Sequence, residues 1–225
     1  MHHANAFKST MQMLLNLQYH PVAMDGLNET AQDIESQMNE KEEVREIALK
    51  SSRTIVRLCG MAIRAMHLGN DPIPDMEEAM EELHKLVGIT RDFPGLRHSG
   101  IVESAMQEYV EVKTLYAYTL GEQLPSYRDL GVTPEAYILG VGDLIGEIRR
   151  LALDNIRKGA VDDAAKHLDN MEKFYDFLMI FNYPDSMVAV RRKQDIARGV
   201  LEKTRGDVTN AIRSYSLEKM LASKE

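Results

Sequence analysis

Cysteine, tryptophan and turn-forming residues are scarce in this sequence of 225 residues. Cys59 is the only cysteine, which excludes an intrachain disulfide and a zinc site built from several cysteines. Tryptophan is absent, aromatic residues make up 6%, and there are 7 prolines and 14 glycines. Because β-sandwiches and barrels are usually richer in aromatic and turn residues, this composition favours an all-α protein.

The sequence also lacks a long hydrophobic run, and no stretch of 18 apolar residues is present. This predicts no transmembrane helix and no membrane partner. The apolar stretch near the start is interrupted by Gln12, Asn16 and Gln18 and has no convincing cleavage site, so we expect no signal peptide. We therefore expect a cytoplasmic protein with an N-terminal extension over residues 1–25 and one helical domain over 26–225.

Positive charge is in the minority, since 27 basic residues face 35 acidic ones and the net charge is −8. A general nucleic-acid binder usually has a basic surplus, so its basic residues would have to be clustered. Steps of three, four and seven along one predicted helix align Lys50, Arg53, Arg57 and Arg64. This basic stripe suits phosphate binding, although a solvated face with salt bridges to another helix is the alternative.

Prolines and glycines divide the chain into long helical blocks. We predict helices over residues 28–68, 75–87, 99–120, 134–158, 161–181 and 185–220. Asp75 with Glu78 suggests a capping box, and Thr133 before Pro134 is a strong start signal. Residues 88–100 are predicted to form a loop, where Arg97 and His98 add positive charge beside the stripe. The first helix is too long for one compact domain, which indicates packing against equally long partners or other subunits.

Two carboxylates stand in a segment that is otherwise apolar or small, YILGVGDLIGEI at residues 137–148. Asp143 and Glu147 share one helix stripe, and burying an unpaired carboxylate is costly. Gly140 and Gly146 in the same segment would let another backbone or a ligand approach closely. These acids therefore require partners.

A second acidic pair, Glu108 and Glu111, shares a face of the preceding predicted helix. Antiparallel packing of the two helices would join four carboxylates, the donor set that Mg²⁺ or Mn²⁺ prefers. Such a site could activate water and stabilise the charge on a phosphodiester. The alternative is structural: solvent exposure, or ion pairs with Lys113, Arg149 or Arg150.

At these same residues the chain resembles the translin superfamily, in particular the TRAX-like branch (translin-associated factor X). The resemblance is carried by MQEYVEVKT at 106–114 and by residues 134–162, which contain the pattern GVxDLxGE, and it extends over residues 98–215. SSRTIVRL at 51–58 is a weaker match.

The resemblance implies a seven-helix fold that assembles into closed octameric shells enclosing RNA. It also implies a Mg²⁺-dependent endoribonuclease for single-stranded RNA, with Mn²⁺ as a substitute ion. The catalytic acids of the TRAX-like branch fall on Glu108, Glu111 and Asp143, and Glu147 matches a further acid of the motif, so all four are the expected metal ligands. The expected RNA-binding residues are Lys50, Arg53, Arg57, Arg64, Arg97 and His98.

Only about 20 residues join the two acidic helices, so the insertion of eukaryotic TRAX proteins is missing. This suggests a compact form that makes a homo-oligomer, with a translin-like partner subunit as the alternative. Two other functions stay open from the sequence. One is a non-catalytic shell that binds single-stranded RNA or DNA, and the other is a purely helical scaffold.

Overall fold

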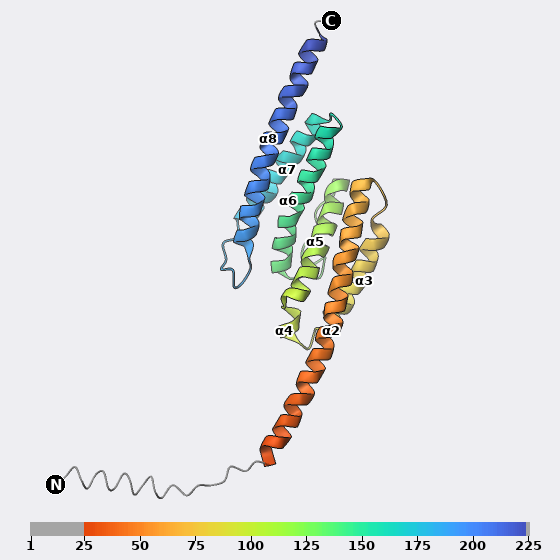
Figure 1. Ribbon diagram of the computed structural model, residues 1–225, viewed down its shortest axis with the longest axis vertical. Helices are drawn as coiled ribbons and strands as arrows, with labels where there is room; N and C mark the ends of the chain where they lie inside the picture. Colours follow the sequence, from red (N-terminus) through yellow and green to blue (C-terminus); the bar gives the residue numbers. More distant parts are fainter. Residues whose placement is uncertain (1–24, 224–225) are drawn as a thin grey trace, which may run out of the picture. The chain divides into compact units, whose positions relative to one another are not determined.

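The computed structural model describes residues 25–223, and every regular element within them is a helix, which confirms the all-α prediction. The helices shown in Figure 1 are α2 (Asp25–Leu68), α3 (Ile73–Ile89), α4 (Pro94–Arg97), α5 (Gly100–Leu120), α6 (Pro134–Arg157), α7 (Val161–Met179) and α8 (Val190–Ala222). The predicted extension over residues 1–25 lies outside the described residues, except for Asp25 at the start of α2.

Contacts divide the chain between Glu43 and Val44, inside α2, into two compact units. Residues 25–43 form a helical segment whose side chains are exposed from Gly26 onward. The unit that begins at Val44 carries the core and all the residues predicted to bind metal or RNA.

Several helix ends lie where the sequence predicts them, because the terminating residues have the required chemistry. Thr133 caps α6 by accepting a hydrogen bond from the backbone N–H of Ala136. Gly69 and Gly121, which follow α2 and α5, have φ angles of 73° and 71°. This left-handed conformation is available to glycine at little cost, so both helices end there.

Three local predictions are wrong. The helix α3 begins at Ile73, not at Asp75, and no side chain caps it through the predicted box. Instead Asp71 Oδ1 accepts from the Ile73 N–H, and a proline is tolerated in the first turn because the N–H groups there have no helical partner. The predicted loop over residues 88–100 contains the short helix α4, whose first residue is a proline. The last helix begins at Val190, after a turn in which Pro184 O accepts from Met187 and Val188.

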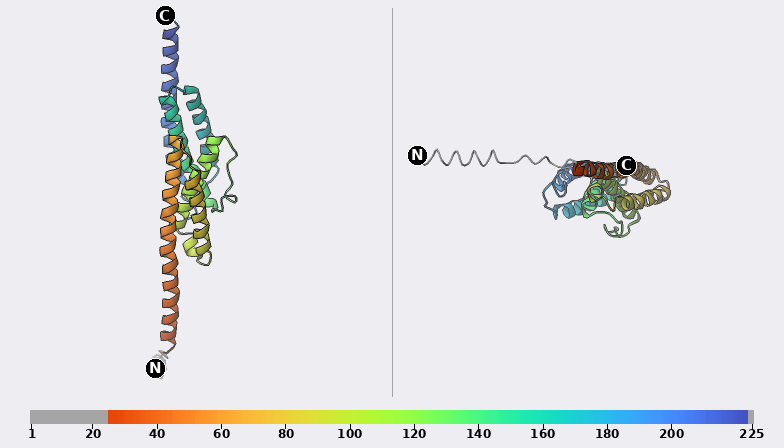
Figure 2. Two further views of the ribbon diagram at one scale, coloured as in Figure 1. Left: turned by 90° about the vertical axis from the view of Figure 1, so that its right-hand side faces the viewer. Right: turned by 90° about the horizontal axis from the view of Figure 1, so that it is seen from below.

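The core of the second unit is built around α6, which packs against α5, α7 and α8, while α3 packs against α5. Figures 1 and 2 show α5 and α6 side by side, with the connection between them looping out from the helices. Fully buried side chains from three of the helices include Leu58 of α2, Leu115 of α5 and Leu144 of α6. Among the described residues, no helix is long and apolar enough to cross a membrane.

Candidate functional site

Four carboxylates lie on α5 and α6, two helices that pack against each other, and all four are partly buried. Burial, and then the nearby charges of Asp143, Glu108 and Glu147 in that order, raise the pKa of Glu111 to about 8. Burial and then the charge of Asp143 also raise the pKa of Glu108. The structure therefore places the other three acids that the sequence singled out near enough to Glu111 for their charges to oppose its ionisation.

Glycine at position 140 allows α5 and α6 to approach closely. A Cβ built on Gly140 would lie 2.7 Å from the backbone oxygen of Gln107 and from Cβ of Val110. The prediction for Gly146 is wrong, because nothing lies within 4 Å of a Cβ built there. At Gly142 the neighbour is a side chain, and the nearest Lys193 carbons lie 3.4 Å from a Cβ built there, an ordinary van der Waals distance.

Asp143 has two partners that sequence reasoning missed. Lys193 of α8 donates to Asp143 Oδ1, and Gln107 Nε2 of α5 donates to Asp143 Oδ2 at 2.5 Å. Lys193 lies 50 residues from Asp143 in the sequence, so spacing along one helix gives no signal for it. Gln107 directly precedes Glu108 and was within the motif, but its neutral amide did not suggest a role.

Glu147 also has a missed partner. His67, in the last turn of α2, places Nε2 2.5 Å from Glu147 Oε2, and its side chain is only 3% exposed. Arg150, one turn further along α6, approaches the same oxygen at 3.9 Å and is largely exposed. Glu147 therefore has part of what the structural alternative requires, because Arg150 lies within ion-pair distance of it. The alternative is not met by Arg149, which pairs with Asp207 at 2.9 Å and donates to Thr204.

The donor set of this carboxylate cluster suits a divalent cation, since hard cations bind several carboxylate oxygens and relieve the repulsion among them. Among the described side chains, no three histidine, cysteine, aspartate or glutamate residues are already placed to hold one metal ion. The ammonium group of Lys193 contacts Asp143, where a metal would need an oxygen. Binding a metal there requires Glu111 to lose its proton and Asp143 to change its partner.

The predicted basic stripe is exposed along α2, where Lys50, Arg53 and Arg57 line a shallow groove together with Ile47 and Thr54. Arg64 continues the exposed stripe and stands three residues before His67, the residue that contacts Glu147. The stripe thus leads along one helix to the edge of the carboxylate cluster.

The two basic residues outside the stripe have local partners. Arg97 donates to the backbone oxygen of Val87 at 3.4 Å, and its side chain is partly buried. His98 is exposed and lies 3.6 Å from Glu103. Arg97 therefore has a structural contact, and His98 lies close enough to Glu103 to form an ion pair when its ring is protonated.

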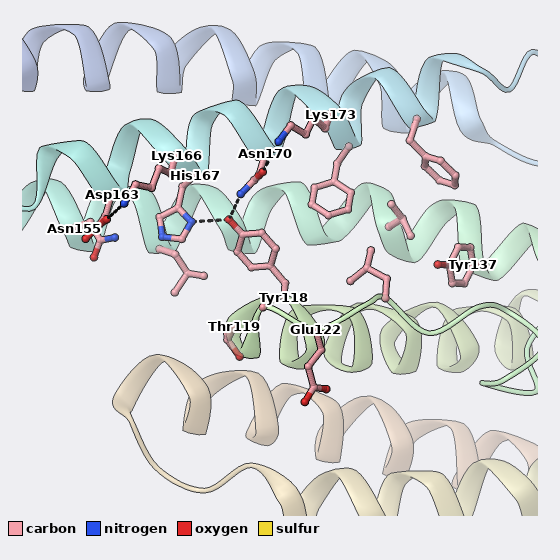
Figure 3. Close-up of a pocket in the computed structure, with 16 residues that line it drawn as sticks. Tyr118, Thr119, Glu122, Tyr137, Asn155, Asp163, Lys166, His167, Asn170 and Lys173 are labelled. Carbon is pink, nitrogen blue, oxygen red and sulfur yellow. Dashed lines mark hydrogen bonds and ion pairs between the residues drawn. The ribbon is translucent and has the colours of Figure 1, made fainter.

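A cavity of about 890 Å³ lies elsewhere in the same unit, between the end of α5, the following connection, α6 and α7 (Figure 3). Tyr118 OH and His167 Nδ1 are 2.6 Å apart there, and Asn170 donates to the same hydroxyl at 3.2 Å. Burial lowers the pKa of His167, which favours the neutral form of its ring. None of the four acids lines this cavity, which makes it separate from the carboxylate cluster.

The chain belongs to the translin family, whose model matches residues 41–205. An uncharacterized protein of Methanocaldococcus jannaschii is 37% identical over 204 residues, which are 89% of each chain. A structure of AfC3PO in complex with duplex RNA is 32% identical, with a TM-score of 0.75, and covers 82% of this chain and 97% of its own. The structure of apo-NeC3PO is 25% identical with a TM-score of 0.63, over 85% and 98%.

Proposed function

We propose that this protein is a metal-dependent endoribonuclease of the TRAX-like branch, with Mg²⁺ as its cofactor and Mn²⁺ as a substitute. The observation that carries the proposal is the convergence of Glu108, Glu111, Asp143 and Glu147, with the pKa of Glu111 raised to about 8. A carboxyl group with so strongly shifted a pKa, among other acids, marks a functional site more often than a structural one.

In this proposal the acids hold the cation and the neighbouring side chains orient the acids. Glu108, Glu111 and Asp143 are the catalytic ligands, and Glu147, oriented by His67, is the fourth carboxylate. When bound, a divalent cation supplies water activation and neutralises the charge that develops on the scissile phosphate. Gln107 fixes the rotamer of Asp143 through its second oxygen.

RNA is the proposed substrate, bound through its phosphates by the exposed stripe on α2. Arg53 and Arg57 provide guanidinium groups that suit phosphate oxygens, and phosphate contacts carry no base information. The structurally similar AfC3PO forms a complex with duplex RNA, which supports RNA as the ligand class. We propose cleavage in single-stranded RNA, because only a flexible strand can bend a phosphate into a cluster enclosed by α2, α5, α6 and α8.

We further propose that the chain works as a closed homo-oligomer of eight subunits, without a separate translin-like subunit. Large apolar side chains remain exposed on α8, in particular Ile212, Leu217, Met220 and Leu221. An unpartnered apolar face on a long helix requires a partner surface, which a second copy of the chain would provide.

One observation favours a second candidate, a translin-like shell that binds RNA without cleaving it. Lys193 and Gln107 already satisfy both oxygens of Asp143 without a metal. In that case the acids would stabilise the packing of α5, α6 and α8, and the basic stripe alone would account for function.

The test is cleavage of end-labelled oligoribonucleotides by the purified full chain, with Mg²⁺ or with EDTA. Single-stranded and duplex forms of one sequence are compared at equal concentration. The proposal expects internal cleavage of the single strand with Mg²⁺ and none with EDTA. Binding of either RNA without metal-dependent cleavage would support the non-catalytic shell instead.

A further inference from the structure

Lys193 reaches the carboxylate cluster from a different helix than the acids. It lies in the first turn of α8, and the aliphatic carbons of its side chain pack against Gly142 of α6, with the nearest of them 3.4 Å from a Cβ built on that glycine. The ammonium group donates to Asp143, and both side chains are mostly buried, at 21% and 26% exposed. The contact is thus a built feature of the α6–α8 packing.

The charge of Lys193 also acts on two acids of α5. It lowers the pKa of both Glu108 and Glu111, opposing the effect of burial and of the neighbouring acids. Gln107 is neutral, and the guanidinium group of Arg150 lies on the side of Glu147. Lys193 therefore occupies the place beside Asp143 where a metal cation would otherwise neutralise the carboxylate.

Building on the proposed function, we propose that Lys193 is an internal counter-cation that competes with the divalent metal for Asp143. Without metal, its single charge stabilises the acids and keeps α8 packed on α6. A divalent cation brings a second charge and takes the Asp143 oxygen, so the ammonium group must withdraw. Lys193 then sets the metal concentration at which the site fills.

A metal titration of the full chain tests this directly. Free Mn²⁺ is followed by electron paramagnetic resonance for the metal-stripped wild type, Lys193→Met, Lys193→Arg and Arg192→Met. Methionine has a similar stem without charge, and arginine retains the charge. Arg192 is the exposed neighbour of Lys193, so its substitution removes the same charge without touching Asp143.

Removing the competing charge is expected to tighten Mn²⁺ binding by about tenfold or more in Lys193→Met, because opposite charges interact strongly in a half-buried site. Lys193→Arg should stay within about threefold of wild type because it retains the charge, and Arg192→Met should do so because surface charges are screened. In EDTA, Lys193→Met should melt at a lower temperature than wild type. Mn²⁺ should raise the melting temperature of Lys193→Met by more than it raises that of wild type. A purely structural role predicts weaker metal binding in the Met variant.

Unchanged or weaker Mn²⁺ binding in a folded Lys193→Met, beside clear binding in wild type, overturns the competition and leaves the proposed function intact. If neither protein binds Mn²⁺, the proposed metal site itself fails. Should Lys193→Met not fold, Lys193→Gln carries the same expectation, because its amide still donates to Asp143 without a charge.

Discussion

His67 Nε2 lies 2.5 Å from Oε2 of Glu147 and joins the last turn of α2 to the middle of α6. The two residues are 80 positions apart, and the histidine side chain is almost completely buried. The contact fixes the fourth carboxylate of the cluster and connects it to the helix that carries the basic stripe.

Replacing His67 with alanine should lower the free energy of unfolding by about 1–3 kcal/mol, because it leaves a partly buried carboxylate without its main donor. Denaturant unfolding in EDTA measures the change. His67→Gln should recover part of the loss, since its amide can donate to the same oxygen. Arg150→Ala is the matched control, because that residue is exposed and 3.9 Å from the oxygen. We expect less than about 0.5 kcal/mol there; a larger loss than in His67→Ala would contradict the assignment.

The stability of the metal-free protein should fall as the pH rises from about 5 to 8. The pKa of Glu111 is raised from 4.5 to about 8 in the folded chain. Between these values the folded chain retains a proton that the unfolded chain releases, so unfolding is favoured as the pH increases. Melting temperatures in EDTA across this range should show the fall, and Glu111→Gln should show a smaller one. Equal slopes for the two proteins would mean that Glu111 is not the group responsible.

Two glycines on α6 should respond oppositely to alanine. Gly140→Ala should lower the free energy of unfolding by about 1–3 kcal/mol, because the new methyl meets the backbone of α5 at 2.7 Å. Gly146→Ala has open space and should raise it by up to about 1 kcal/mol through helix propensity. Chemical denaturation of both variants measures the pair. A neutral Gly140→Ala would show that α5 and α6 are less closely packed than the structure has them.

The basic stripe should govern RNA affinity through phosphates. The double variant Arg53→Ala with Arg57→Ala should weaken RNA binding alike for different sequences, and reduce the slope of log K against log salt by about 1–2. Arg157→Ala with Lys158→Ala, two exposed residues at the C-terminal end of α6, is a charge-matched control. Binding by fluorescence anisotropy across a salt series decides the question. Equal losses in the two double variants would point to net charge instead of the stripe.

The oligomer should have a mass of about 200 kDa, eight times the 25.5 kDa of one chain. Light scattering at micromolar concentration measures it. Leu217→Asp with Leu221→Asp places two charges on one exposed face of α8 and should reduce the mass. A monomeric mass for the wild type would exclude the shell.

Local signals in the sequence were sufficient for most helices and for the acids. Thr133 and Gly121 determine helix ends through their own backbone chemistry, so they could be read without the fold. The spacing of Asp143 and Glu147 in an apolar segment was equally local. Lys193 and His67 could not be found in this way, because their roles arise from the packing of α8 and α2 against α6, which helix periodicity does not specify. The late start of α8 has a local origin instead, in a turn in which Pro184 O accepts from Met187 and Val188.

The carboxylate cluster is the proposed site of the catalytic metal. The triple variant Glu108→Gln, Glu111→Gln, Asp143→Asn tests this role. These substitutions remove charge with little change in volume, and neutral amides are poorer ligands for Mg²⁺. Mg²⁺-dependent cleavage of single-stranded RNA is measured alongside circular dichroism, oligomer mass and RNA affinity. We expect the triple variant to lose cleavage while it remains folded and assembled and still binds RNA. Near-normal cleavage by that folded variant would contradict the proposed role of the cluster.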